Sequence, residues 1–292
     1  MLHNVLCDTK GVIMQSNSTA LIEQPHSHWW LKLASNLSKG ACWLGRQSRD
    51  LIHKLHPDLR EQLAELPLIA VTQLAPKSTP ELLLTQPTRR IVIFVHGYGG
   101  SRGNFIPMQT YFRMVGHHNT LSVGFDDTSS IECMADELRS TLRSLIIRNQ
   151  LPPQSIDIVA HSLGGIISRV TLQDKDLHPY VRTLITLASP HAGSGLARYL
   201  DTPTCRGLRP GSELLKNLEE QKGWGQGNVP RLVAFWTPKD CILIPADSAQ
   251  LEGAENICKP ECTHLSFLLK PDVWHEIICA MEQPSETQSI SV

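Results

Sequence analysis

Short apolar runs alternate with amphipathic stretches from residue 89 onward. Residues 91–95 (Ile-Val-Ile-Phe-Val) form a continuous apolar run, which is typical of a strand buried in a parallel sheet. Similar runs predict further strands at 120–125, 155–160, 181–187 and 231–236. Between them, helical spacing predicts helices at 104–115, 131–148 and 163–172, the second capped by Ser129 or Ser130. This alternation predicts an α/β fold whose mostly parallel central sheet has helices on both faces.

Residues 1–85 have a different pattern. Apolar residues recur there at helical spacing, as in Leu51, Leu55, Leu59, Leu63 and Leu66. Pro57 and Pro67 interrupt this spacing, so we expect two or three helices rather than one. A stretch rich in Pro, Thr and Ser at 75–88 then predicts a linker. The sequence therefore predicts a helical N-terminal extension and linker over 1–85 and an α/β domain over 86–292. Within that domain, residues 190–228 are rich in Gly and Pro and predict a lid-like or cap-like insertion over the strand ends.

Composition narrows the class of protein. Among 292 residues, 27 Lys and Arg nearly balance 28 Asp and Glu, so no basic field favours nucleic acid as a partner. No apolar run is long enough to span a membrane, and residues 1–8 lack a basic segment followed by an apolar one, so we expect a cytoplasmic protein. The eight Cys are scattered, which fits a reducing compartment. Cys258, Cys262 and His264 leave a disulfide or a metal site open, but they supply three ligands where structural zinc takes four, so we expect no metal.

The segment 156–165 carries the clearest chemical signal. An apolar strand pattern ends at Ala160-His161-Ser162-Leu163-Gly164 and continues directly into a helical pattern. A sharp strand-to-helix turn exposes a serine hydroxyl as a nucleophile, and its flanking residues must be small. The usual pattern of such a turn is G-x-S-x-G, and here Ala160 replaces the first Gly. Alanine is the smallest residue after glycine, so this is the mildest departure from the pattern. A serine in a chance glycine turn is the alternative, but the flanking strand and helix favour Ser162 as the nucleophile.

A glycine-rich loop follows the first predicted strand as His96-Gly97-Tyr98-Gly99-Gly100. Acyl transfer places negative charge on a carbonyl oxygen, which needs preorganised N–H donors. We expect these donors to be the backbone amides of Tyr98 and Leu163, which form an oxyanion hole. The loop matches neither G-x-G-x-x-G nor a Walker pattern, which argues against phosphate binding.

A nucleophilic serine needs a base and an acid that orients it. In this fold they follow the serine in the order acid, then histidine. Asp240 follows the strand predicted at 231–236 and is the expected acid, with Asp247 as the alternative. His264, before the last helical pattern, is the expected base, whereas His275 reads as a surface residue of that helix. His96 and His161 precede the acid, so we expect them to support the turns.

These motifs resemble the lipase branch of the α/β-hydrolases, especially small bacterial triacylglycerol lipases and esterases with an Ala-His-Ser-x-Gly-Gly elbow. The matching segments are 95–100, 159–165 and 186–194, together with Asp240, Ile244-Pro245 and His264, and the likeness covers about residues 89–282. The resemblance implies an α/β-hydrolase catalytic domain, a Ser-Asp-His triad and cleavage of carboxylic esters through an acyl-enzyme, without a cofactor. Acyl transfer and thioester cleavage use the same triad and stay open, as does, with less support, a silent binding module.

The resemblance does not extend to residues 1–85. Trp29 and Trp30 open a stretch that mixes Leu and Trp with Lys32, Lys39, Arg46 and Arg49. Trp beside Lys and Arg on a helix is typical of peripheral membrane contact. A helical hairpin packed on the hydrolase domain is the alternative, and a surface for a protein partner is a third.

Overall fold

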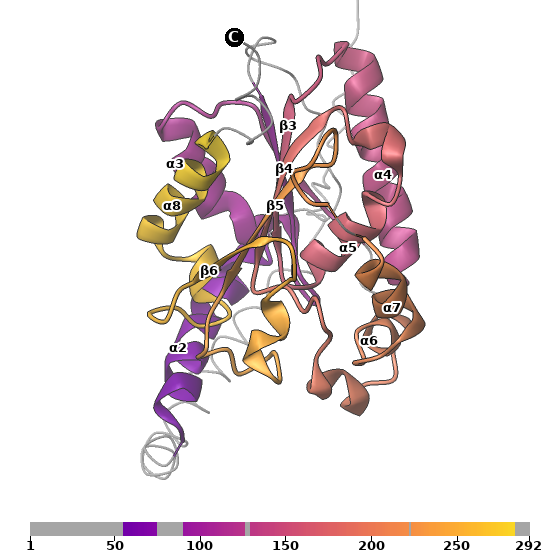
Figure 1. Cartoon of the computed structure of the whole chain (residues 1–292). Helices are drawn as coiled ribbons and strands as arrows, with labels where there is room; N and C mark the ends of the chain where they lie inside the picture. Colours follow the sequence, from indigo (N-terminus) through magenta and orange to yellow (C-terminus); the bar gives the residue numbers. More distant parts are fainter. Residues whose placement is uncertain (1–54, 75–89, 126–128, 222, 284–292) are drawn as a thin grey trace, which may run out of the picture. The chain divides into compact units, whose positions relative to one another are not determined.

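The computed structural model describes residues 55–74, 90–125, 129–221 and 223–283. All of them belong to one compact unit, Leu55–Val292 (Figure 1). The tryptophan-rich stretch at 29–49 lies outside the described residues. None of the helices in the described ranges is long and apolar enough to cross a membrane.

A six-stranded sheet forms the centre of this unit. Its strands are all parallel and lie in the order β2 (Thr120–Val123), β1 (Ile91–Val95), β3 (Ile156–His161), β4 (Val181–Leu187), β5 (Arg231–Trp236) and β6 (Glu255–Cys258). The five predicted strands are confirmed. The sixth was missed because β6 is a short edge strand with mostly exposed residues, so its sequence carries no apolar run.

Helices cover both faces of the sheet, as predicted. Figure 1 shows α3 (Ile106–Met114) and α8 (Pro271–Glu282) on one face, and α4 (Ile131–Asn149) and α5 (Leu163–Thr171) on the other. The apolar residues divide accordingly into two buried clusters, one on each side of the sheet. The Oγ of Ser130 accepts the N–H of Cys133 and caps α4. The first predicted helix begins instead as a 3₁₀ turn, η1 (Arg102–Phe105), before it continues as α3.

Helix α2 (Pro57–Thr72) precedes the sheet in the chain and belongs to the same compact unit. Pro57 lies in its first turn, where the missing N–H is harmless, but Pro67 lies inside the helix and does not end it. Hydrogen bonds to the main body on both sides of Pro67 hold the helix together. The structure thus joins α2 to the α/β domain, whereas the sequence places it in the extension 1–85.

The segment predicted as an insertion, 190–228, forms η3 (Gly195–Tyr199), α6 (Pro203–Gly207) and α7 (Glu213–Glu219), with residue 222 outside the description. Its helices lie beside α4 and α5 (Figure 1). Several hydrogen bonds attach it to the rest of the domain. Among them, Thr204 Oγ1 donates to Ser129 O at 2.9 Å, and the Arg169 guanidinium donates to Leu218 O at 2.5 Å. A lid function for this segment stays a prediction.

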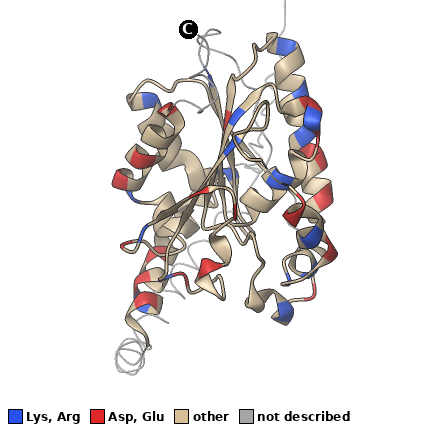
Figure 2. Cartoon of the chain, viewed as in Figure 1, with Lys and Arg blue, Asp and Glu red and all other residues tan. Residues whose placement is uncertain are grey.

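Charged residues lie mainly on the helices and loops, and both signs occur along α4 (Figure 2). The sheet has one buried exception, Asp157 on β3, which pairs with Arg90 at 3.1 Å and Arg182 at 3.0 Å. Both arginines also donate to the carbonyl of Met281, so this cluster ties the end of α8 to the sheet. It lies at the start of the strands, at the edge opposite their carboxyl ends.

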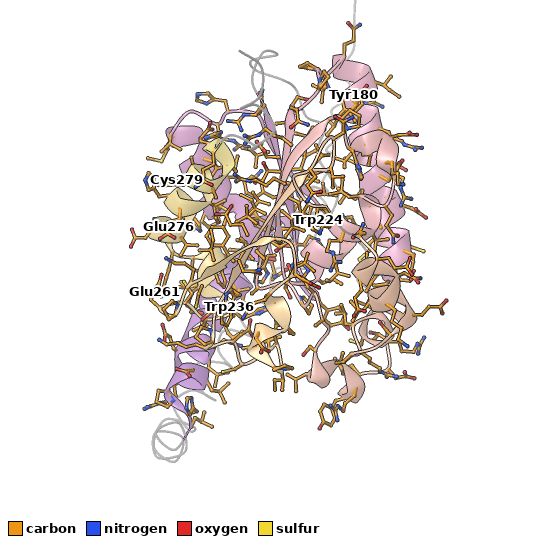
Figure 3. The ribbon with its side chains drawn as sticks, in the orientation of Figure 1. Tyr180, Trp224, Trp236, Glu261, Glu276 and Cys279 are labelled. Carbon is orange, nitrogen blue, oxygen red and sulfur yellow. The ribbon has the colours of Figure 1, made fainter. Side chains whose placement is uncertain are left out.

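The exposed edge of the sheet is fixed to α8 by an ion-pair bridge. Lys259, just after β6, pairs with Glu261 at 2.6 Å and with Glu276 of α8 at 2.7 Å. Figure 3 shows Glu261 and Glu276 on this side of the molecule. The bridge holds the chain that leads into the loop of His264.

Candidate active site

Ser162 lies in the sharp turn between β3 and α5. Its backbone angles, φ 53° and ψ −123°, fall in a region that residues with a side chain rarely occupy. Such strain persists only where the surroundings hold it. Here the Ser162 N–H donates to Leu187 O at 2.8 Å, and the Ser162 carbonyl accepts the N–H of Gly165 at 3.0 Å. The predicted nucleophile therefore sits on a turn of the predicted type, with its side chain partly exposed.

The two glycines after Ser162 are required by packing. A Cβ at Gly164 would lie 2.3 Å from the carbonyl oxygen of Val95 on β1, and one at Gly165 would lie 2.2 Å from Ser189 Oγ. Helix α5 therefore approaches the ends of β1 and β4 more closely than any side chain allows. This close approach sets the position of the first turn of α5 and of the Leu163 N–H.

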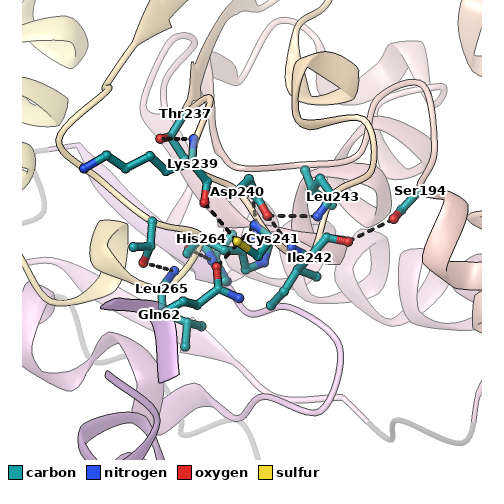
Figure 4. Close-up of polar contacts among 12 residues, drawn as sticks. Gln62, Ser194, Thr237, Lys239, Asp240, Cys241, Ile242, Leu243, His264 and Leu265 are labelled. Atoms are coloured by element: carbon teal, nitrogen blue, oxygen red, sulfur yellow. Dashed lines mark hydrogen bonds and ion pairs between the residues drawn. The ribbon is translucent and has the colours of Figure 1, made fainter. Parts of the chain in front are cut away.

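Asp240 and His264 form a buried hydrogen-bonded pair (Figure 4). The His264 Nδ1 lies 2.6 Å from Asp240 Oδ2, while Asp240 Oδ1 accepts the N–H groups of Ile242 and Leu243, each at 2.8 Å. Burial acts to raise the pKa of the Asp240 carboxyl, but His264 and the two amides outweigh it, so the pKa is lowered. Asp240 is thus held as a carboxylate that orients the imidazole. The alternative acid, Asp247, is exposed.

His161 supports the backbone of His264. Its Nε2 lies 2.9 Å from the carbonyl oxygen of His264, and because a carbonyl only accepts, this nitrogen carries the proton. Burial, followed by the neighbouring His264, lowers the pKa of His161 to about 3, so the ring is neutral. The two rings meet edge to face, with centroids 4.8 Å apart. His161, which directly precedes Ser162, therefore holds the backbone of His264 through this hydrogen bond. His275 is exposed on α8, as expected.

The glycine loop after β1 is held by His96. The Gly97 carbonyl accepts the N–H of Gly100 at 3.1 Å and lies 2.9 Å from His96 Nδ1. Because His96 Nε2 accepts the N–H of Phe125, its Nδ1 carries the proton and donates to Gly97 O. In a trans peptide the next N–H, that of Tyr98, points to the side opposite these bonds. A Cβ at Gly97 would lie 2.8 Å from Ser162 Cβ, so this peptide is next to the serine.

The strand order explains why these groups converge. The chain leaves β1 toward β2 on one side and returns to β3 on the other, so β1 and β3 are neighbours and the loops after them begin side by side at the carboxyl edge of the sheet. Strand pairing of Val95 with Ala160 sets the glycine loop beside Ser162. The structure thus brings Asp240 and His264 into direct contact, and it packs the ring of His161, the residue before Ser162, against that of His264. Among the described residues, no hydrogen bond joins Ser162 Oγ to the His264 ring.

Arg169 is a buried polar residue that sequence reasoning missed, and its partner His191 lies in the segment 186–194 that the sequence singled out. The buried Arg169 guanidinium lies 3.4 Å from His191 Nδ1, and the other ring nitrogen of His191 lies 3.0 Å from Thr186 Oγ1. Burial, followed by Arg169, lowers the pKa of His191 well below its usual value. A neutral His191 therefore joins α5 to the turn after β4. The Pro190-His191 motif marks the turn in the sequence, but nothing there indicates Arg169 as its partner.

Cys258 and Cys262, the pair left open by the sequence, are both free thiols. In the described ranges, no cluster of three or more His, Cys, Asp and Glu is arranged to hold a metal ion. A cavity of about 450 Å³ lies away from the site, between the end of α5 and the end of α7. Leu172, His178 and Trp224 line it, and Trp224 is labelled in Figure 3. None of the predicted site residues borders this cavity.

Comparison of the sequence with known families finds one match in its middle third. Residues 131–202, which contain Ser162 but neither Asp240 nor His264, match the family described as "PGAP1-like alpha/beta domain". The GPI inositol-deacylase of Debaryomyces hansenii is 42% identical over 53 residues, which are 18% of this chain and 5% of that protein. The GPI inositol-deacylase A of Yarrowia lipolytica is 39% identical over 72 residues, 23% of this chain and 6% of that protein. The matched part is thus a small fraction of these relatives.

Comparison of the structure with solved ones finds the same fold in lipases. Aspergillus fumigatus lipase B gives a TM-score of 0.60 at 14% identity, over 72% of this chain and 58% of that one. Bacillus licheniformis lipase BlEst2 gives 0.56 at 17% identity, over 71% of this chain and 98% of that one. The α/β-hydrolase fold predicted from the sequence is therefore confirmed.

Proposed function

We propose that this chain is a serine hydrolase that cleaves carboxylic esters through an acyl-enzyme. The observation that carries the proposal is the buried Asp240–His264 pair beside the strained turn that presents Ser162. The glycine loop and the N-terminus of α5 meet at the same serine. The match of residues 131–202 to a deacylase-related domain supports it from a separate direction.

The reaction follows from the roles of these groups. His264 Nε2 takes the proton of Ser162 Oγ, and the oxygen attacks the ester carbonyl. The amides of Tyr98 and Leu163 stabilise the negative charge on the carbonyl oxygen, and collapse of this intermediate breaks the ester bond as His264 protonates the leaving alcohol. Water then attacks the acyl-enzyme with His264 as base, which releases the acid and restores Ser162. Asp240 holds the Nδ1 proton and stabilises the imidazolium in both halves.

An apolar acyl group suits the surroundings of Asp240. Ser194 Oγ donates to Ile242 O at 3.0 Å, and Gly195 N–H donates to Ile244 O at 2.7 Å, which places η3 beside the loop of Asp240. Leu196 of η3, Ile242 and Ile244 are all exposed apolar residues of these two segments. Exposed apolar residues brought together in this way favour a lipid ester. The names of the curated relatives make an acylated inositol one candidate for the alcohol portion.

Hydrolysis of p-nitrophenyl esters from acetyl to palmitoyl tests the proposal. We expect wild-type activity with an optimum at medium or long chains, complete loss in Ser162→Ala, and full activity in Ser140→Ala, an exposed serine of α4. A fluorophosphonate probe should label the wild type and Ser140→Ala but not Ser162→Ala. Labelling without hydrolysis would favour acyl transfer, and addition of alcohol or thiol acceptors would then reveal it. Wild type with neither labelling nor turnover would contradict the proposal and favour a binding module.

We also propose peripheral membrane contact through residues 1–54, on the basis of Trp29 and Trp30 beside Lys32 and Arg46. Liposome co-sedimentation would compare the full chain with a chain that begins at Leu55. Greater partitioning of the full chain is expected, whereas equal partitioning would exclude the contact.

A further inference from the structure

The loop that carries His264 is organised by two hydroxyl groups. Thr263 Oγ1 lies 3.3 Å from each of the N–H groups of Leu265 and Ser266, and Ser266 Oγ lies 2.9 Å from the N–H of Thr263. Both hydroxyls are therefore acceptors for the backbone on either side of His264. The side chains of Thr263, His264 and Ser266 are all buried, so the proton of each hydroxyl needs a hydrogen-bond acceptor within the protein.

Glu65 of α2 supplies both partners. Its Oε1 accepts the Ser266 hydroxyl at 2.5 Å, and its Oε2 accepts the Thr263 hydroxyl. Each hydroxyl donates its single proton in a hydrogen bond to the Glu65 carboxyl group. The lone pairs of the hydroxyl oxygens therefore stay available to the three backbone N–H groups. A residue nearly 200 positions earlier in the chain thus closes the network that surrounds His264. An ionised acceptor makes these bonds stronger than neutral ones.

The same helix contacts the loop of the acid. Gln62, one turn before Glu65 and buried, accepts the N–H of Cys241 through Oε1 at 3.4 Å (Figure 4). Cys241 directly follows Asp240. The two halves of the Asp240–His264 pair therefore rest on neighbouring positions of one face of α2.

The last turn of α2 contacts the oxyanion loop. Asn104 Nδ2 donates to Thr72 Oγ1 at 2.7 Å, and Ser101 Oγ lies 3.4 Å from Thr72 O. Asn104 Oδ1 in turn accepts the N–H of Ser101 at 2.7 Å, at the end of the Gly97–Gly100 turn. One helix thus bonds the loops of the acid, the base and the oxyanion hole, which come from three different strands.

We propose that Glu65 is a positioning residue for His264, and that α2 is part of the catalytic apparatus through it. The proposal rests on the proposed hydrolase function, because it concerns the orientation of the base in that reaction. Glu65 acts through Thr263 and Ser266, which hold the backbone on both sides of His264 and so set the distance between its Nε2 and Ser162. Displacement of a catalytic group by about 1 Å costs up to about 100-fold in rate.

Steady-state kinetics on a p-nitrophenyl ester tests this role. We expect Glu65→Ala to lower kcat by about 10- to 100-fold with KM within about twofold, because substrate contacts are unchanged. Glu65→Gln should lie between this variant and wild type, since an amide oxygen still accepts one of the two hydroxyl protons. The matched control is Glu61→Gln. Glu61 precedes Glu65 by one turn and pairs with Lys239 at 3.5 Å and Lys270 at 3.8 Å, and these side chains are 34–41% exposed. Such pairs contribute little, so kcat should stay within about twofold.

A second readout does not require turnover. The proton on His264 Nδ1, shared with Asp240 at 2.6 Å, should give a low-field NMR resonance that Asp240→Asn abolishes. We expect this resonance to broaden or shift in Glu65→Ala and to stay unchanged in Glu61→Gln. Thermal unfolding identifies any variant that fails to fold, and the isosteric Glu65→Gln then provides the comparison.

The outcomes separate the two proposals. Wild-type turnover and labelling, with Glu65→Ala and Glu65→Gln unchanged in kcat and in the low-field resonance, would overturn the role of Glu65 alone. A rise in KM with unchanged kcat would overturn it as well. Absence of labelling and turnover in wild type would overturn the hydrolase function, and the positioning role with it.

Discussion

Replacement of Asp240 by asparagine changes one atom, and the structure determines how the new side chain must lie. Oδ1 of Asp240 accepts two backbone N–H groups at 2.8 Å, and an NH₂ group cannot accept either of them. The amide oxygen of the substituted side chain must therefore keep this position, and its NH₂ must face His264. The NH₂ would then donate to His264 Nδ1, so the ring proton would move to Nε2. In that tautomer His264 Nε2 already carries a proton and cannot take that of Ser162.

The expected loss follows from the tautomer, since the fold is retained. We expect kcat on p-nitrophenyl butyrate to fall by about 10⁴, equivalent to about 5 kcal/mol of transition-state stabilisation, with KM little changed. Labelling by a fluorophosphonate should slow in parallel. The control is Asp247→Asn, an exposed carboxylate of the same loop, which should behave as wild type. A loss below about tenfold in Asp240→Asn, at unchanged thermal stability, would refute the assignment of Asp240 as the orienting acid.

Three further predictions concern stability. Asp157→Ala leaves Arg182 without its buried partner, so denaturant unfolding should show a loss of about 3–5 kcal/mol, and a loss below about 1 kcal/mol would contradict the pairing. Gly164→Ala places a Cβ 2.3 Å from Val95 O, so thermal unfolding should show a loss of stability of about 1–3 kcal/mol. Kinetic assays should show a lower kcat. Unchanged stability and kcat would refute the packing argument. The pKa of His161 is about 3 in the folded state and about 6.5 in the unfolded chain. Between pH 6 and 4 unfolding therefore takes up a proton at this residue, so the free energy of unfolding falls as the pH falls. His161→Gln should reduce this slope by about 1.4 kcal/mol per pH unit, as urea unfolding at several pH values would show, and an equal slope in both proteins would contradict it.

The sheet and the turn at Ser162 were predictable because their signals are local. Each of the five predicted strands is a short apolar run, and Gly164 and Gly165 supply the small residues that the turn after Ser162 requires. The pairing of Asp240 with His264 was expected from chain order and is present as a hydrogen bond. Its catalytic role, like that of Tyr98 and Leu163, remains a proposal.

The support around the site could not be predicted, because it depends on contacts between distant segments. Glu65 reads in the sequence as an ordinary polar position of an amphipathic helix, and its partners Thr263 and Ser266 lie almost 200 residues away. Strand β6 is exposed on an edge and has the composition of a loop. In both cases the packing of other segments, rather than local propensity, determines the structure.

Helix α2 determines where the chain can be shortened for biochemical work. A chain that begins at the predicted boundary near residue 85 would retain Ser162, Asp240 and His264, yet it would lack Gln62, Glu65 and Thr72. Loss of activity in such a truncated protein would then look like loss of an essential membrane anchor or regulatory region, although its cause would be three unsupported loops. A chain that begins at Leu55 keeps these contacts, so the residues before it are best tested by comparing the full chain with a chain that starts there.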